Sequence, residues 1–211
     1  KGTWKIRVIK VIDVPVTYGG KAVHNIMNCV PAVLSTYFWR NIEIEDIRLA
    51  LQTFIPSSTQ TPGRLNLFQF KHFQFLVDFA HNPAGLELLC DFVSKLDGEP
   101  KVGIISGTGD RRDEDIKELG RISGRYFDEI IIRQDKNLRG RTAEEIVNLL
   151  VAGIKETQPK EIPIEIIYNE KEAIMHAYNN VKPGSLITIM CDVVAEALDL
   201  IKGLKEKEDT E

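Results

Sequence analysis

The sequence predicts an α/β fold in which a mostly parallel, Rossmann-like sheet is flanked by helices. Short runs of β-branched residues alternate with segments of helical periodicity between residues 73 and 204. This alternation is typical of parallel strands joined by helical crossovers. Two of the runs, VGIIS at 102–106 and LITIM at 186–190, are almost continuously apolar. A strand needs such a sequence when helices cover both faces of its sheet.

The amino-terminal segment has a different pattern. Residues 4–18 alternate in polarity and are rich in Val and Ile, which predicts two short strands that end at Gly19 and Gly20. Apolar residues then recur at helical spacing over 26–37 and again over 43–54, so two helices are expected. The run of Pro, Ser and Thr that follows, up to residue 63, offers nothing to bury and is expected to mark a domain boundary.

Beyond this boundary, strands and helices are expected to alternate up to residue 204. Strands are predicted at 73–79, 102–106, 129–133, 162–167 and 186–190, and helices at 83–96, 113–125, 142–156, 170–180 and 194–204. The predicted domains are therefore residues 1–62 and 63–204, followed by a charged and frayed tail at 205–211.

Composition argues against several classes of protein. A formal charge of -4 does not indicate wholesale binding to nucleic acid or to an anionic membrane. No apolar stretch reaches the ~18 residues of a membrane span, and the amino end lacks a signal-peptide pattern, so the cytoplasm is the expected location. Cys29, Cys90 and Cys191 lie far apart within apolar runs, which predicts buried thiols rather than disulfides or a zinc site.

The first predicted strand beyond the boundary is followed by polar residues. Ligands of open parallel sheets bind beyond the carboxyl ends of the strands, so these residues are candidates for a binding site. Asp78 could accept hydrogen bonds from ribose hydroxyls, and His81 could donate to an anion near the next helix. Asn82 precedes Pro83 and is a good N-cap. The alternative is that Asn82 only caps the helix and Asp78 only braces the turn.

Two further loops are charged and open a helix. Residues 106–115 combine two glycines with Arg111 and Arg112, and backbone N–H groups beside arginines can bind phosphate or carboxylate. Alternatively, these two arginines only neutralise the acidic residues that follow them. In the next loop, Arg139 and Arg141 could grip a substrate carboxylate, although a charge run of this kind is more often a solvated surface.

Several familiar motifs do not occur in the sequence. It contains neither the phosphate-binding pattern G-x-x-x-x-G-K-[ST] nor the dinucleotide pattern G-x-G-x-x-G, because Arg112 stands where the third glycine of the latter is needed. The G-x-S-x-G and H-E-x-x-H patterns are absent as well. Arg64 directly follows the linker, and an Arg at a hinge can reach a phosphate when domains close.

Five motifs in this order resemble the end of a Mur ligase, and most nearly the Mur-ligase-like module of cyanophycin synthetases. They are HNIMN (24–28), PGRLNLF (62–68), VDFAHNPAGLE (77–87), GDRRDEDIKELG (109–120) and LRGRTAEEI (138–146). The resemblance implies that residues 1–62 end a central ATPase domain and that 63–204 form the carboxy-terminal domain. It also implies a ligase reaction, in which ATP phosphorylates a carboxylate and an amine then displaces phosphate to form an amide.

The resemblance assigns residues to two sets of ligands. For the nucleotide, it implies that Asn28 contacts adenine, Arg64 reaches the phosphates and Asp78 binds ribose, while His81 and Asn82 line the same pocket. For the incoming amino acid, with arginine or aspartate favoured, it implies contacts from Asp110, Arg111, Arg139 and Arg141. The partners implied are thus ATP, an amino acid and the missing amino-terminal part of the enzyme, and a homo-oligomer is compatible with the sequence.

The phosphate-binding loop, the magnesium ligands and the catalytic Lys of the family are expected upstream of Lys1. This chain is therefore expected to hold no catalytic or metal-binding residue and to hydrolyse no ATP alone, although ATP and Mg²⁺ are the implied cofactors. A second interpretation is a nucleotide-binding or interaction module without catalysis, for which the absent loop is the main support. A third is a Rossmann oxidoreductase that binds NAD.

Overall fold

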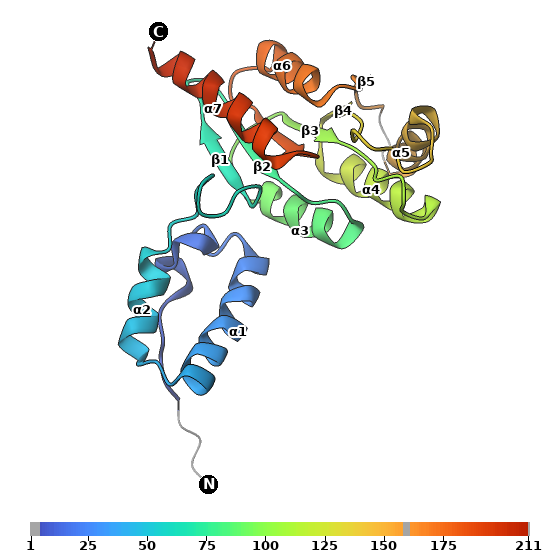
Figure 1. Cartoon of the computed structure of the whole chain (residues 1–211). Coiled ribbons are helices and arrows are strands. Elements are labelled where there is room, and N and C mark those ends of the chain that lie inside the picture. The colour runs from blue at the N-terminus through green and yellow to red at the C-terminus, as the bar shows by residue number, and fades with distance from the viewer. Residues whose placement is uncertain (1–4, 158–160, 211) are drawn as a thin grey trace. The chain divides into compact units, whose positions relative to one another are not determined.

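The computed structural model describes residues 5–157 and 161–210 (Figure 1). The chain divides into two compact units, residues 1–60 and 61–211. The division lies two residues before the domain boundary expected after residue 62.

The first unit is a helical hairpin, in which α1 (Val23–Arg40) and α2 (Ile44–Thr53) are joined by a three-residue turn. Asn41 begins the turn in a left-handed conformation, with φ of 51°, and ends α1. The helices predicted at 26–37 and 43–54 are thus confirmed. The first helix begins earlier and ends later than its apolar periodicity indicated.

The two strands predicted over residues 4–18 are wrong wherever the structure describes that segment; Trp4 lies outside the described residues. The segment instead contains two 3-10 turns, η1 (Val11–Asp13) and η2 (Pro15–Thr17). The Thr17 hydroxyl lies 2.8 Å from the carbonyl oxygens of both Val11 and Val14 and holds these turns together. A strand needs a neighbouring strand to satisfy its backbone, and the described part of this unit contains none.

The second unit contains a six-stranded sheet with the order β1-β2-β6-β3-β4-β5. Its strands are β1 (Asn66–Gln69), β2 (Gln74–Asp78), β3 (Lys101–Ile105), β4 (Glu129–Ile132), β5 (Ile164–Ile166) and β6 (Leu186–Met190). All neighbouring pairs are parallel except β1 and β2, which form an antiparallel hairpin. The α/β class and the mostly parallel sheet are therefore confirmed. Strand β1 was not predicted.

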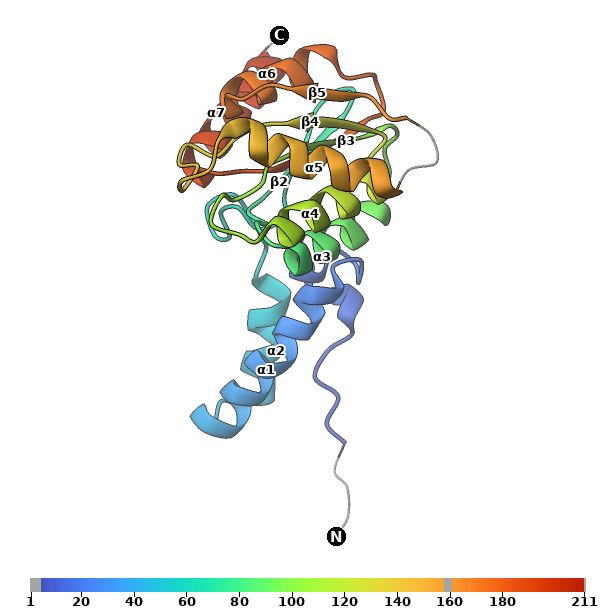
Figure 2. The same ribbon diagram turned by 90° about the vertical axis from the view of Figure 1, so that its right-hand side faces the viewer.

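In the described part of this unit, helices cover the sheet in two layers: α3 (Pro83–Ser94), α4 (Asp113–Tyr126), α5 (Ala143–Thr157), α6 (Glu170–Asn180) and α7 (Val194–Thr210). Figure 1 and Figure 2 show α3, α4 and α5 on one face and α6 and α7 on the other. The core beneath α6 and α7 includes Val77, Ile104 and Ile189, each with no exposed surface. Because every central strand is covered on both sides, its apolar run is continuous rather than alternating.

Helix α7 extends six residues beyond the predicted end at 204, through the tail that was expected to be frayed. Lys205 pairs with Glu208 at 3.2 Å and with Asp209 at 2.5 Å, which are the spacings at which side chains meet on a helix. The Glu208 carboxylate also accepts a hydrogen bond of 3.0 Å from the backbone N–H of Lys71. The charges of this segment therefore stabilise the helix instead of ending it.

The cysteines follow the sequence prediction in part. Cys90 and Cys191 are buried and Cys29 is half-buried, and all three are free thiols. Burial raises the pKa of the Cys191 thiol to about 12, so it is protonated and unreactive at neutral pH.

Candidate functional site

Strands β2, β3, β4 and β6 end at the same edge of the sheet, and the loops that follow them enclose a small cavity of about 170 Å³. We call it the arginine cavity because three arginines line it. Its lining residues are Phe79, Ala80, His81, Ser106, Thr108, Arg111, Arg133, Asp135, Arg139, Cys191 and Asp192. The sequence-predicted residues His81, Arg111 and Arg139 thus come together from three different loops.

Asp78 ends β2 and is only 8% exposed. Its carboxylate accepts a 3.0 Å hydrogen bond from the backbone N–H of Leu65, a residue held at φ of 50°. Burial raises the pKa of Asp78, while the Leu65 N–H and the charge of Arg64 act in the opposite direction. Asp78 therefore braces the loop that enters the sheet. Its contact with ribose remains a prediction.

Arg64 and His81 both lie close to the aromatic ring of Phe79. The Arg64 guanidinium carbon is 5.7 Å from the centroid of the Phe79 ring, and the His81 ring is 5.1 Å from the same ring. The Nδ1 atom of His81 is 3.0 Å from the Phe79 carbonyl oxygen, which fixes the orientation of the imidazole. The end of β2 therefore brings three of the nucleotide candidates close together, namely Arg64, Asp78 and His81.

The remaining nucleotide candidates have simpler surroundings. Asn82 caps α3, because its side chain accepts a 2.8 Å hydrogen bond from the backbone N–H of Gly85. It is not among the residues that line the arginine cavity. Asn28 is exposed on α1 in the first unit, so its expected contact with adenine stays a prediction.

Arg111 is half-buried and incompletely hydrogen-bonded. It lines the arginine cavity, and its Nε atom is buried without a hydrogen-bond partner among the residues that the structure describes. A buried guanidinium N–H group normally has an acceptor, because an unmade hydrogen bond of this kind is costly. The neighbouring Arg112 instead pairs with Asp115 in solvent, with 84% of its side chain exposed. The two adjacent arginines therefore have different surroundings.

The other amino-acid candidates are partly occupied by contacts within the protein. Arg139 lines the cavity and forms an ion pair with Asp110, whose pKa this hydrogen bond lowers. Arg141 lies outside the lining residues. Its guanidinium donates to the carbonyl oxygens of Gly109 and Arg111, both at 2.9 Å, and pairs with Asp113 at 2.6 Å. Arg141 thus ties the two charged loops together and supports the cavity from outside.

Sequence reasoning missed Arg133, a buried charge between the loops. This residue follows β4 and is 1% exposed. Its guanidinium pairs with Asp135 at 2.7 Å and with Glu170 at 3.1 Å, and its Nε donates to the Met190 carbonyl oxygen at 3.1 Å. The only sequence signal was an Arg at the end of an apolar strand, EIIIR. The partners could not be identified, because they lie on other elements.

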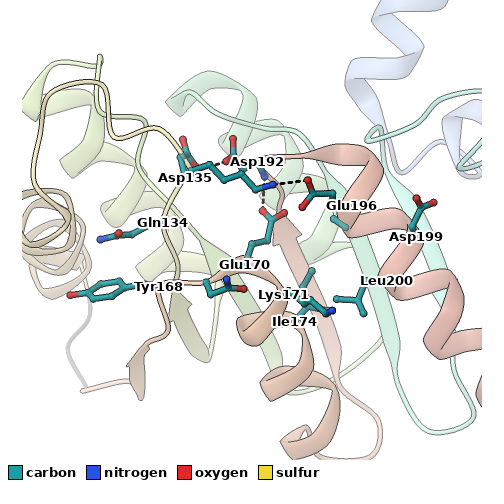
Figure 3. Close-up of a pocket in the computed structure, with 13 residues that line it drawn as sticks. Gln134, Asp135, Tyr168, Glu170, Lys171, Ile174, Asp192, Glu196, Asp199 and Leu200 are labelled. Carbon is teal, nitrogen blue, oxygen red and sulfur yellow. Dashed lines mark hydrogen bonds and ion pairs between the residues drawn. The ribbon is translucent and has the colours of Figure 1, made fainter.

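A larger cavity of about 780 Å³ adjoins the first, and Figure 3 shows its lining side chains. We call it the acidic cavity because five of the residues that line it are carboxylates. Its lining residues are Gln134, Asp135, Lys136, Tyr168, Asn169, Glu170, Lys171, Ile174, Asp192, Glu196, Ala197, Asp199 and Leu200. The two cavities share Asp135 and Asp192, which therefore form the wall between them.

Hydrogen bonds fix the carboxylates of the acidic cavity near the sheet. Glu170 accepts a 2.6 Å bond from the backbone N–H of Asp192, and Asp192 in turn accepts a 2.7 Å bond from the backbone N–H of Lys136. The Lys136 ammonium group pairs with Glu196 at 2.6 Å. Burial raises the pKa of Glu170, against the opposing charge of Arg133.

Over residues 5–157 and 161–210, no group of three or more His, Cys, Asp and Glu side chains could hold a metal ion. Within the same residues, none of the helices is both long and apolar enough to cross a membrane.

Comparison with known proteins gives similar sequences over nearly the whole chain. A cyanophycin synthetase of Crocosphaera subtropica is 40% identical over 201 residues, which are 95% of this chain and 23% of that protein. The cyanophycin synthetase of Synechocystis sp. is 39% identical over 205 residues, or 97% of this chain and 23% of that protein. The chain therefore spans about a quarter of the length of these relatives.

Solved structures share the fold. A Mycobacterium tuberculosis folylpolyglutamate synthase, solved in complex with ADP, matches 85% of this chain and 40% of its own with a TM-score of 0.66 and 21% identity. The UDP-N-acetylmuramate-alanine ligase of Thermotoga maritima matches 87% of this chain and 38% of its own, with a TM-score of 0.61 and 12% identity. At these identities the likeness concerns the fold alone.

The family itself follows from a direct match. The sequence pattern described as Mur ligase, glutamate ligase domain, matches residues 63–192, which form most of the second unit. Since this match covers more than half of the chain, the chain belongs to the Mur ligase family.

Proposed function

We propose that the protein is an ATP-dependent carboxylate-amine ligase of the cyanophycin synthetase type, and that this chain supplies nucleotide and amino-acid contacts. The γ-phosphoryl group of ATP passes to a substrate carboxylate, giving ADP and an acyl phosphate. The amine nitrogen then attacks the acyl carbon, an amide bond forms, phosphate leaves and the amine loses a proton. We place the reaction in the cytoplasm.

The observation that carries this proposal is the arginine cavity at the tips of four parallel strands. Arg111 and Arg139 line it from separate loops, and the buried Nε of Arg111 lacks an acceptor in the described structure. Fixed guanidinium groups in a partly closed site stabilise negative charge, which develops on phosphate and on the acyl oxygen in this reaction. The cavity is therefore assigned to an anionic group of the substrate.

The nucleotide contacts are proposed at the neighbouring end of β2. The Arg64 guanidinium lies over the Phe79 ring and leaves N–H groups for phosphate oxygens. His81 lies close to the same ring and lines the arginine cavity. Asp78 and Asn82 already accept backbone hydrogen bonds, so a ribose hydroxyl has to share these acceptors. We assign adenine to Asn28 in the first unit.

The chain alone is proposed to be inactive. It lacks the G-x-x-x-x-G-K-[ST] loop, and its described residues hold no set of side chains suited to Mg²⁺. The remaining part of the protein is assigned the phosphate-binding loop and the catalytic Lys.

A phosphate-release assay tests the proposal. The purified 211-residue chain is expected to release no more phosphate from ATP than a heat-denatured sample. The whole protein is expected to release ADP and phosphate only when both a carboxylate acceptor and an amino acid are present. ATP turnover by the 211-residue chain, or turnover by the whole protein that no amino acid accelerates, is the result that contradicts the assignment.

A further inference from the structure

We propose that Arg141 is a positioning residue of the ligase site. It clasps the loop of residues 109–113 to the loop of residues 138–142 and thereby fixes the position of Arg111 relative to Arg139, which both line the arginine cavity. This inference rests on the proposed function, and it replaces the expectation that Arg141 contacts the amino acid. Arg141 takes this role because its guanidinium group is already bonded within the chain.

The guanidinium group of Arg141 meets three acceptors of one loop. Its Nε atom donates to the Gly109 carbonyl oxygen and one terminal nitrogen donates to the Arg111 carbonyl oxygen, both at 2.9 Å. The other terminal nitrogen lies 2.6 Å from the Asp113 carboxylate. A planar guanidinium fork can satisfy several acceptors at once, whereas a Lys ammonium group acts as a point charge on a flexible stem. Arg141 is therefore directed at the loop of residues 109–113 and not at the cavity.

The backbone around Arg141 is fixed from both sides. Before it, residues 139 and 140 adopt left-handed conformations, with φ of 50° and 90°, and the Arg141 N–H closes this turn on the Leu138 carbonyl oxygen at 3.1 Å. After it, Thr142 and Glu145 form a capping box, in which each accepts a hydrogen bond from the backbone N–H of the other, at 3.2 Å and 2.8 Å. The Arg141 side chain therefore extends from a well-defined backbone, as a positioning residue requires.

The two loops also touch directly through their backbones. A Cβ atom at Gly109 would overlap the Leu138 carbonyl oxygen, so glycine is needed for this close approach. The carbonyl group of the same glycine accepts a hydrogen bond from Arg141. A backbone contact and the guanidinium clasp therefore act together on the loop that carries Arg111.

Arg139 reaches the same loop in a different way. It lines the arginine cavity and pairs with Asp110, and the two side chains are 48% and 46% exposed. An exposed ion pair of this kind contributes little stability, so a bound anion can replace Asp110 at little cost. The Arg141 side chain is only 25% exposed and has three acceptors instead of one. The turn thus carries one arginine that holds the loop and one that can change its partner.

Hydrogen exchange of the whole protein tests the clasp itself. Arg141→Gln removes the guanidinium fork and is expected to speed the exchange of the backbone amides of residues 109–111 about tenfold. Arg141→Lys keeps the charge without the fork and is expected to have the same effect. The matched control is Arg112→Gln, because the Arg112 side chain belongs to the same loop and is 84% exposed. Exchange in the Arg141 variants that is no faster than in this control overturns the proposal.

Steady-state kinetics of the whole protein separate positioning from a purely structural role. Below the thermal transition of every variant, kcat for amino-acid-dependent ADP release is expected to fall at least about tenfold in both Arg141 variants. Gly109→Ala leaves Arg141 in place but forces the loops apart at Leu138, and it is expected to lower kcat as well. An unchanged kcat shows a role in stability alone, whereas rescue by Arg141→Lys shows direct contact with the substrate. Either result overturns the proposal.

The wild-type protein distinguishes this inference from the proposed function. If the wild type shows no amino-acid-dependent ADP release, the proposed function fails and the positioning role fails with it, whatever the exchange rates are. If the wild type is active and its kcat does not depend on Arg141, only the positioning role fails.

Discussion

Single residues at the strand tips serve both the fold and the proposed site. Asp78 is the clearest example, because its carboxylate accepts the Leu65 N–H while burial raises its pKa. The native protein therefore binds the Asp78 proton more tightly than the unfolded chain does. Ionised Asp78 consequently costs stability, and this cost grows as the pH rises from the ordinary pKa of an aspartate through the raised value, then levels off.

Two substitutions separate the hydrogen bond from the charge. Asp78→Ala leaves the Leu65 N–H without an acceptor and is expected to lower the free energy of unfolding by about 2 kcal/mol. Asp78→Asn keeps an acceptor and removes the charge, so its stability relative to the wild type should increase across the pH window just described. Urea unfolding at a series of pH values measures both effects. Equal destabilisation by Asn and Ala at every pH would show that the brace is not a hydrogen bond.

Only some of the residues at the candidate site could be predicted from the sequence. Asp78, His81, Arg111 and Arg139 could be found because a parallel sheet brings the ends of its strands to one edge. Arg133 could not be assigned, because its role depends on partners that the chain supplies from distant positions. Glu170 and Glu196 resembled acidic residues that stabilise the first turn of a helix, and only the packing of α6 and α7 places them around one cavity.

Among the elements, the strands and helices of the second unit were predictable to within a few residues, apart from β1 and the extension of α7. Their apolar runs are long enough, and the helix caps distinct enough, to identify each of these strands and helices from local sequence alone. The misses have physical causes. Strand β1 has only four residues and is defined by its hairpin with β2. The Val- and Ile-rich segment before α1 has strand propensity, but residues 5–60 contain no partner strand for it.

Helices α4 and α5 pack closely through two glycines. A Cβ atom at Gly120 would lie 2.2 Å from the Leu150 carbonyl oxygen, and one at Gly153 would lie 1.9 Å from the Lys117 carbonyl oxygen. Since both obstacles are backbone atoms, they cannot move without shifting a helix. These helices follow the loops that hold Arg111 and Arg139, so their separation sets the shape of the arginine cavity.

Gly153→Ala is therefore expected to lower the free energy of unfolding by about 2 to 3 kcal/mol. The matched control is Gly203→Ala in α7, where a Cβ atom meets nothing within 4 Å. This control is expected to raise stability by about 0.5 to 1 kcal/mol, because Ala has the higher helix propensity. Thermal unfolding measures both changes. If Gly153→Ala is as well tolerated as Gly203→Ala, the close packing of α4 and α5 is refuted.

For the whole molecule, the two units differ in how much apolar surface they bury. The second unit has a continuous core on both faces of its sheet. In the first unit, α1 has no buried residue, and Phe38 and Trp39 are 75% and 85% exposed. An exposed apolar surface of this extent is typical of an interaction surface. Together with the share of the relatives that this chain covers, it supports a function that needs the whole protein.

The most direct test of the ligase assignment compares the two adjacent arginines in the whole protein. Arg111→Gln removes the guanidinium group whose Nε atom lacks a hydrogen-bond partner in the described structure. This variant is expected to lower kcat for amino-acid-dependent ADP release roughly 100-fold. Arg112→Gln removes an exposed arginine and is expected to leave kcat within about twofold of the wild type. Equal rates for the two variants would contradict the claim that the arginine cavity stabilises the reacting anion.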